Sequence, residues 1–208
     1  MKYFLALSRY IDALNTYVGK AVTWLTLLVV LISAGNAVVR KFLNVSSNAW
    51  LELQWYLFGA IFLLAAGYTF LRNEHVRVDI LSQRLPKRTQ IMIEIFGVVF
   101  FLFPACLLIF WLSIPVFYNS FMTHELSSNS GGLIRWPVKL LIPVGFLLLI
   151  LAGVSHLIKC VVFLMGKGPD PTDVSRGKTA EEELADEILL QTRSDAHGKP
   201  GGSDGGAA

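Results

Sequence analysis

Charged residues are scarce in this sequence of 208 residues. Only 16% of the chain is Asp, Glu, Lys or Arg, whereas an ordinary soluble domain carries about 25%. A chain that is 54% hydrophobic and has so few charges cannot form the polar surface of a soluble protein. The composition therefore indicates an integral membrane protein.

Cysteine and histidine are also rare, which limits the chemistry available. Cys106 and Cys160 lie in different apolar blocks, so neither a disulfide framework nor a thiolate metal site is recognisable. Only one histidine, His156, lies well inside an apolar block, whereas a haem would need two at matched depth. Ser155 precedes it, but neighbours on a helix point about 100° apart, and no acid lies near them in that block. We therefore expect His156 to pack between helices, and we expect that this chain binds no cofactor and is not an enzyme.

The apolar residues are gathered into four blocks. Each block has the roughly twenty residues that cross a hydrocarbon core of about 30 Å as a helix. They predict an all-α integral membrane protein with a four-helix membrane domain over residues 1–166. The predicted transmembrane helices cover residues 17–39, 51–71, 91–117 and 137–165. Pro104 lies near the middle of the third, where we expect a kink that serves packing.

Lys and Arg are unevenly divided between the two ends of these helices. Fourteen of the eighteen lie before or at the start of the first block, between the second and third, or at the end of the fourth and beyond it. The other four are Arg40, Lys41, Arg135 and Lys139. Because positively charged loops remain in the cytoplasm, we expect both termini and the second loop to be cytoplasmic.

Both terminal segments differ from the apolar blocks. In residues 3–18, apolar residues recur at spacings of three and four, opposite Arg9, Asp12 and Asn15. This pattern predicts a short amphipathic N-terminal segment, either a helix on the cytoplasmic surface or a cytoplasmic extension of the first span. After Gly166 the chain holds nine acidic and five basic residues among many Gly and Pro. Residues 167–208 are therefore expected to be a mostly disordered, acidic cytoplasmic tail.

The second block begins with polar residues among aromatic ones. Glu52 and Gln54 lie beside Trp50 at the expected outer membrane surface. The Glu52 carboxylate could be satisfied by water, by Arg40 and Lys41, or by a partner subunit. Further along, the small residues Gly59 and Gly67 would let another helix approach closely, which is how helices associate inside lipid.

The second block ends in the stretch "LRNEHVRVDIL", with Arg72, His75, Arg77 and Asp79. If the helix continues, His75 and Asp79 lie four residues apart on one face and can pair. If it ends, Asp79 can cap a short helix that stops before Pro86. In both alternatives these residues fix how the second span turns toward the third. They could do so within this chain alone, or they could also contact a second chain.

These residues resemble the DctQ-type small permease of tripartite ATP-independent periplasmic (TRAP) transporters. In that family a Trp and acidic residues begin the second helix, small residues follow, and a basic residue and a His-x-basic-x-Asp stretch end it. The corresponding residues here are Trp50, Glu52, Gly59, Gly67, Arg72, His75, Arg77 and Asp79. The family often has two adjacent acids after the Trp, whereas Leu53 follows Glu52 here.

The resemblance implies a location in the bacterial inner membrane and two protein partners. One is a large multi-span permease subunit that carries the substrate and Na⁺ sites, and the other is a periplasmic binding protein that delivers an organic acid. The chain is also expected to contact the lipid bilayer, and no nucleic acid is expected as a partner. The alternative function is a stand-alone four-span assembly or signalling adaptor that acts through its acidic tail.

Overall fold

The computed structural model describes residues 2–43, 47–72 and 85–166, all within one compact unit, Met1–Thr172. The helices are α1 (Lys2–Leu43), α2 (Asn48–Leu71), α4 (Lys87–Gly97), the π-helical turn η1 (Val98–Leu102), α5 (Phe103–Met122) and α6 (Trp136–Leu164). With α4, η1 and α5 forming one continuous helix, four helices are long and apolar enough to cross a membrane. This confirms the predicted all-α fold, and the described part of the chain contains no strand beyond one isolated bridge.

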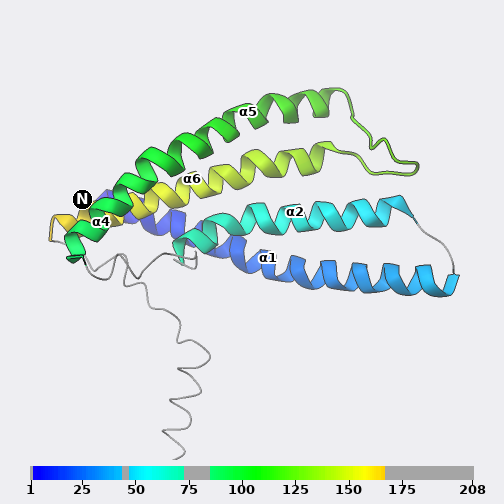
Figure 1. The fold of residues 1–208 in the computed structure, drawn as a ribbon, viewed down its shortest axis with the longest axis horizontal. Helices are drawn as coiled ribbons and strands as arrows, with labels where there is room; N and C mark the ends of the chain where they lie inside the picture. Colours follow the sequence, from blue (N-terminus) through cyan, green and yellow to red (C-terminus); the bar gives the residue numbers. More distant parts are fainter. Residues whose placement is uncertain (1, 44–46, 73–84, 167–208) are drawn as a thin grey trace, which may run out of the picture. The chain divides into compact units, whose positions relative to one another are not determined.

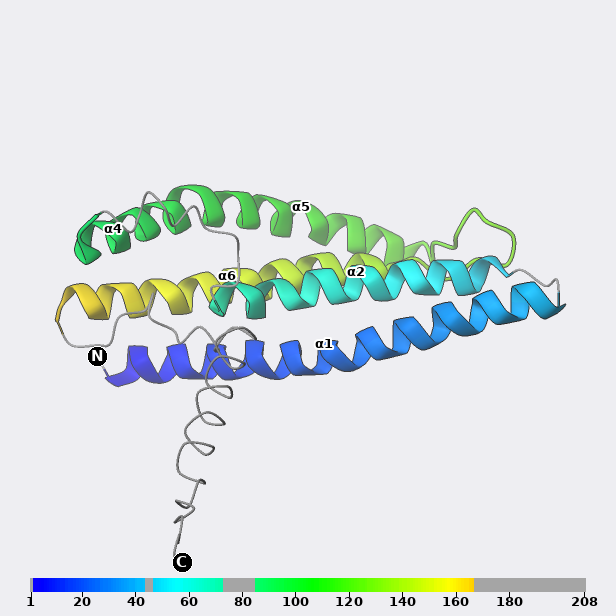
Figure 2. The same cartoon turned by 60° about the horizontal axis from the view of Figure 1, so that its bottom comes forward.

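The helix α6 is the centre of this bundle. It packs against α1, α2 and α5, and α1 also packs against α2 (Figure 1). A second view shows the same arrangement, with α6 between the α4–α5 helix and α1 (Figure 2). The third span is therefore held to the rest of the bundle mainly by α6.

The interior of the bundle is made of small and polar side chains. Ala152, Ser155 and Cys160 on α6 are completely buried, whereas the large side chains of Trp24, Phe62 and Trp111 are 74%, 78% and 74% exposed. Lipid tails are as apolar as leucine, so helices in a membrane gain little from burying large apolar groups against one another. Close approach and hydrogen bonds hold this bundle together, and its outer surface is apolar.

The amphipathic N-terminal segment is the first part of α1, because that helix runs without a break from Lys2 to Leu43. Ser8, Ile11 and Asn15 face the bundle, where they are 2%, 6% and 1% exposed. The apolar Phe4 and Tyr10 on the other side are exposed. Of the two alternatives from the sequence, the structure has the extension of the first span. Ser8 and Asn15 point inward on it, whereas Arg9 is exposed.

The disturbance expected at Pro104 takes the form of the π-helical turn η1. A proline donates no backbone hydrogen bond and crowds the carbonyl four residues earlier, here that of Phe100. In the wider turn, the N–H of Phe103 donates to the carbonyl of Val98, five residues back. The side chains of Leu102 and Phe103 pack over Gly153 of α6, so the turn lies where the third span contacts the centre of the bundle.

Candidate functional site

Glu52 lies at the start of α2 and binds the loop between α5 and α6, residues 123–135. One carboxylate oxygen accepts hydrogen bonds from the Ser127 hydroxyl and from the Asn129 amide nitrogen at 2.8 Å. The other oxygen accepts from the backbone N–H of Leu133 at 2.7 Å. Glu52 is only 5% exposed, so these three donors replace the water that a carboxylate would otherwise require.

The loop is shaped to surround that carboxylate. Its two sides meet at an isolated antiparallel bridge between Leu126 and Ile134. A Cβ atom on Gly132 would lie 3.0 Å from a Glu52 oxygen and closer still to Ser127, so glycine is required for this approach. Asn48 donates a further hydrogen bond, at 3.0 Å, to the Ser130 carbonyl. The first turn of α2 thus fixes the loop at several points.

Glu125 fixes the same loop to α6. Its carboxylate contacts the Lys139 ammonium, and it lies 3.6 Å from the Arg135 guanidinium. The hydrogen bond from Lys139 is the main cause that holds the pKa of Glu125 below its usual value of 4.5. Glu125 follows His124, whose positive φ of 46° ends α5 in a left-handed turn. Two carboxylates, one from α2 and one from the loop itself, therefore hold residues 123–135.

Acidification is expected to loosen this loop. A carboxyl whose pKa is lowered by folding stabilises the folded state fully above its usual value, and that contribution is lost as pH falls through the lower folded pKa. Hydrogen exchange of the amides of residues 123–135 should therefore become faster, after correction for intrinsic rates, as pH falls well below 4.5. The part of this increase in exchange rate that comes from protonation of Glu125 should be absent in Glu125→Gln. If the exchange rate in that variant rises with falling pH just as in the wild-type chain, Glu125 does not contribute to the pH dependence.

Among the described residues, the Glu52 carboxylate is satisfied by the α5–α6 loop, about eighty residues further along the chain, and not by Arg40 and Lys41. A contact of Glu52 with a partner subunit stays a prediction. Gln54, two residues further along α2, is half-buried. No local pattern connects Glu52 with Ser127 or Leu133, so sequence reasoning could not find this contact.

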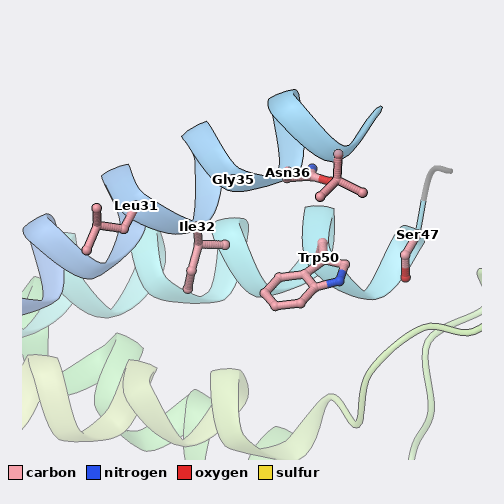
Figure 3. Close-up of a pocket in the computed structure, with 7 residues that line it drawn as sticks. Leu31, Ile32, Gly35, Asn36, Ser47 and Trp50 are labelled. Carbon is pink, nitrogen blue, oxygen red and sulfur yellow. The ribbon is translucent and has the colours of Figure 1, made fainter. Parts of the chain in front are cut away.

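Trp50 lies on another side of α2, facing α1. It is 50% exposed and lines a cleft of about 380 Å³ together with Leu31, Ile32, Gly35 and others from the end of α1. Figure 3 shows its ring lying beside these turns of α1. The cleft is apolar apart from Asn36 and Ser47, so this side of the bundle suits an apolar neighbour or lipid.

The two glycines of α2 that the sequence singled out have different surroundings. Gly67 is buried where α1 and α6 both meet α2, and a Cβ there would collide with the Asn15 side chain and lie 3.1 Å from the Leu148 carbonyl oxygen. A Cβ on Gly59 would make only an ordinary contact, 3.9 Å from Val138. The small size of Gly67 therefore serves packing within this chain, and a contact of either glycine with another subunit stays a prediction.

The end of α2 is described only as far as Arg72. Its guanidinium lies over the Tyr68 ring, 5.1 Å from the centroid, and its backbone N–H donates to the Tyr68 carbonyl at 3.1 Å. His75, Arg77 and Asp79 lie outside the described residues. Whether they pair with one another or with a second chain stays a prediction.

A polar contact between α1 and α6 was not predicted from the sequence. The Ser155 hydroxyl lies 2.7 Å from that of Ser8 and donates to the Asp12 carboxylate at 2.5 Å. Lys159, one turn further along α6, forms an ion pair with Asp12 at 2.6 Å. These contacts explain why the polar Ser8 of α1 points inward. The alternation of polar and apolar residues in α1 was visible in the sequence, but not the direction in which each face points.

His156 points away from that contact, toward α4. It is 5% exposed, its Nε2 lies 3.0 Å from a Glu94 oxygen, and the edge of its ring meets the Phe70 ring. The expectation of a buried histidine with a packing role is confirmed. Ser155 and His156 serve different helix contacts, so they do not assemble into a nucleophile and its base.

Comparison with known proteins adds a family. The family model for the DctQ component of tripartite ATP-independent periplasmic transporters matches residues 28–162. That range runs from the middle of α1 almost to the end of α6. Comparisons with curated proteins and with solved structures returned no match.

Proposed function

Because this chain belongs to the DctQ component family of tripartite ATP-independent periplasmic transporters, we propose that it braces the large permease subunit of such a transporter. DctQ proteins are components of a transporter, and the family is not one of enzymes. The transporter would be driven by an ion gradient and take up an organic acid. The substrate and the coupling Na⁺ would bind to the large subunit, and this chain would touch neither.

The observation that carries the proposal is the character of the bundle's surface and interior. The described helices expose large apolar side chains around the bundle, as lipid or a second membrane protein requires. Their interior is closed by small residues such as Ala152 and Gly145, and a Cβ on Gly145 has no room. A transporter needs a polar binding site near the midplane of the membrane, so a tightly closed bundle is suited to support instead of transport.

The loop fixed by Glu52 and Glu125 suits a second role, which is to help dock the periplasmic binding protein. In the inner membrane, with both termini in the cytoplasm as the Lys and Arg distribution indicates, residues 123–135 would face the periplasm. A loop held at several points loses little freedom when a partner binds, and this raises affinity. We assign to it a part of the surface on which the periplasmic binding protein docks.

Co-purification with the large subunit tests the bracing role. A tagged copy of this chain should recover a much larger membrane protein at equal stoichiometry, and deletion of this chain should abolish uptake of the organic acid. In the same recovery experiment, Asp79→Ala should lower the yield of the large subunit more than it lowers insertion of this chain. Normal uptake after the deletion would overturn the proposal.

Truncation after Gly166 separates this role from the alternative of a stand-alone adaptor. The tail lies outside residues 28–162, which the family model matches. A bracing subunit should support uptake without its tail, whereas an adaptor that acts through the tail should lose its function. Loss of function in a truncated chain that still inserts in the membrane and never recovers a large subunit would favour the adaptor.

A further inference from the structure

Three side chains that commonly bind metals meet at the end of the bundle where α4 begins and α6 ends. Glu94 comes from α4, and His156 and Cys160 come from successive turns of α6. The His156 Nε2 atom lies 3.0 Å from a Glu94 oxygen and 3.4 Å from the Cys160 sulfur. All three atoms that could bind a metal lie within 4.8 Å of one another.

These distances are close to those of a tetrahedral zinc site. Zinc bonds of about 2.0–2.1 Å to nitrogen or oxygen and about 2.3 Å to sulfur place neighbouring ligand atoms about 3.3–3.6 Å apart. The two distances from His156 Nε2 differ from these values by a few tenths of an ångström. The Glu94 oxygen and the Cys160 sulfur, which lie within 4.8 Å of each other, would come to about 3.5 Å apart when a metal ion binds. The spacing of four residues between His156 and Cys160 places both on one face of α6, as for the two zinc-binding histidines of a metalloprotease helix.

The kind of ligands and their burial restrict the metal. An imidazole with a thiolate favours Zn²⁺ and disfavours Mg²⁺ or Ca²⁺, which prefer oxygen ligands. Cys160 is completely buried and the His156 side chain is 7% exposed, whereas the Glu94 side chain is 19% exposed. Of the three side chains, Glu94 is therefore the one most accessible to a metal ion from outside.

We propose that Glu94, His156 and Cys160 bind one Zn²⁺ ion. The ion would coordinate a Glu94 oxygen, His156 Nε2 and Cys160 Sγ, with water as the fourth ligand, and the Cys160 thiol would release its proton on binding. It would connect the third span to α6 beside η1, in a region where Met92, Ile93 and Phe96 are all more than half exposed. This proposal does not depend on the role in transport.

Cobalt binding to the full-length purified chain, with any subunit that accompanies it, tests the site. After treatment with a chelator, one Co²⁺ per chain should produce the near-ultraviolet absorption of a cobalt–thiolate bond. Cys160→Ser should abolish that absorption, whereas Cys106→Ser should retain it. Cys106 is the matched control, because it is also a buried free cysteine but lies on α5. Absence of the band from the wild-type chain, or its persistence in Cys160→Ser, would overturn the proposal.

Zinc titration provides a second measurement that does not use the thiol variants. Zn²⁺, but not Mg²⁺, should raise the Tm of the wild-type chain by several degrees. Glu94→Gln keeps the size of the side chain and should weaken Zn²⁺ binding by at least about tenfold, since even indirect partners of a metal contribute that much. Equal zinc affinity in the wild-type chain and in Glu94→Gln would show that the three residues form only a hydrogen-bonded packing contact.

Discussion

Replacement of Gly145 by alanine is expected to lower the Tm of the purified bundle by about 4–8 °C, from a loss of about 2 kcal/mol in the free energy of unfolding. A Cβ atom at this position would lie 2.7 Å from the backbone oxygen of Leu63 and 2.8 Å from its Cβ. Backbone atoms cannot turn aside as the end of a flexible side chain can. The methyl group would therefore separate α2 from α6 at the centre of the bundle.

Gly59→Ala is the matched control for this experiment. Gly59 also lies on the surface between α2 and α6, but its Cβ would meet only Val138 at 3.9 Å, which is an ordinary contact. Alanine is favoured over glycine in a helix by up to about 1 kcal/mol, so Gly59→Ala should leave the Tm unchanged or raise it. Equal losses in the two variants would mean that the close approach at Gly145 is not what holds the two helices together.

Glu52→Gln is expected to release the α5–α6 loop and increase its rate of proteolytic cleavage by about tenfold or more, because local opening controls cleavage. Glutamine has the same shape but keeps only one acceptor oxygen, and its amide nitrogen would face a hydrogen-bond donor. Either the N–H of Leu133 or the pair of donors from Ser127 and Asn129 would then have no acceptor. A buried donor without an acceptor destabilises the arrangement that buries it.

Glu125→Gln provides the comparison on the same loop. Its carboxylate is 30% exposed and its contacts are ion pairs near the surface, which water and salt weaken. Cleavage should therefore increase much less than in Glu52→Gln. Cleavage that rises equally in both variants would show that Glu52 has no special part in holding the loop.

The transporter provides a functional measurement of the same change. With the loop released, the concentration of binding protein needed for half-maximal uptake should rise by about tenfold, because binding must then restore the order that Glu52 provides. A loss of uptake with no change in cleavage would contradict this explanation. It would instead indicate that Glu52 contacts a partner directly, as one interpretation of the sequence held.

The presence of four helices long and apolar enough to cross a membrane could be predicted from the sequence alone. The second span was expected at residues 51–71 and the fourth at 137–165, and the corresponding helices are Asn48–Leu71 and Trp136–Leu164. A run of about twenty apolar residues must form a helix in lipid, because each of its backbone groups has to find a hydrogen bond within the segment. The resemblance to the DctQ component was also carried by residues close together in the second span, and the family match confirms it.

Only the tertiary structure decided which face of each helix points inward and which groups satisfy the buried polar atoms. In a soluble protein the apolar face identifies the core, but lipid tails are as apolar as leucine, so an apolar helix face in a membrane can point outward to lipid. The periodic pattern in residues 3–18 therefore left the direction of α1 open, and its polar residues Ser8 and Asp12 pack against α6. Glu52 and the loop, like Glu94 and His156, meet across more than sixty residues of chain. Such contacts leave no local pattern in the sequence, because they form only when packed helices bring the two groups together.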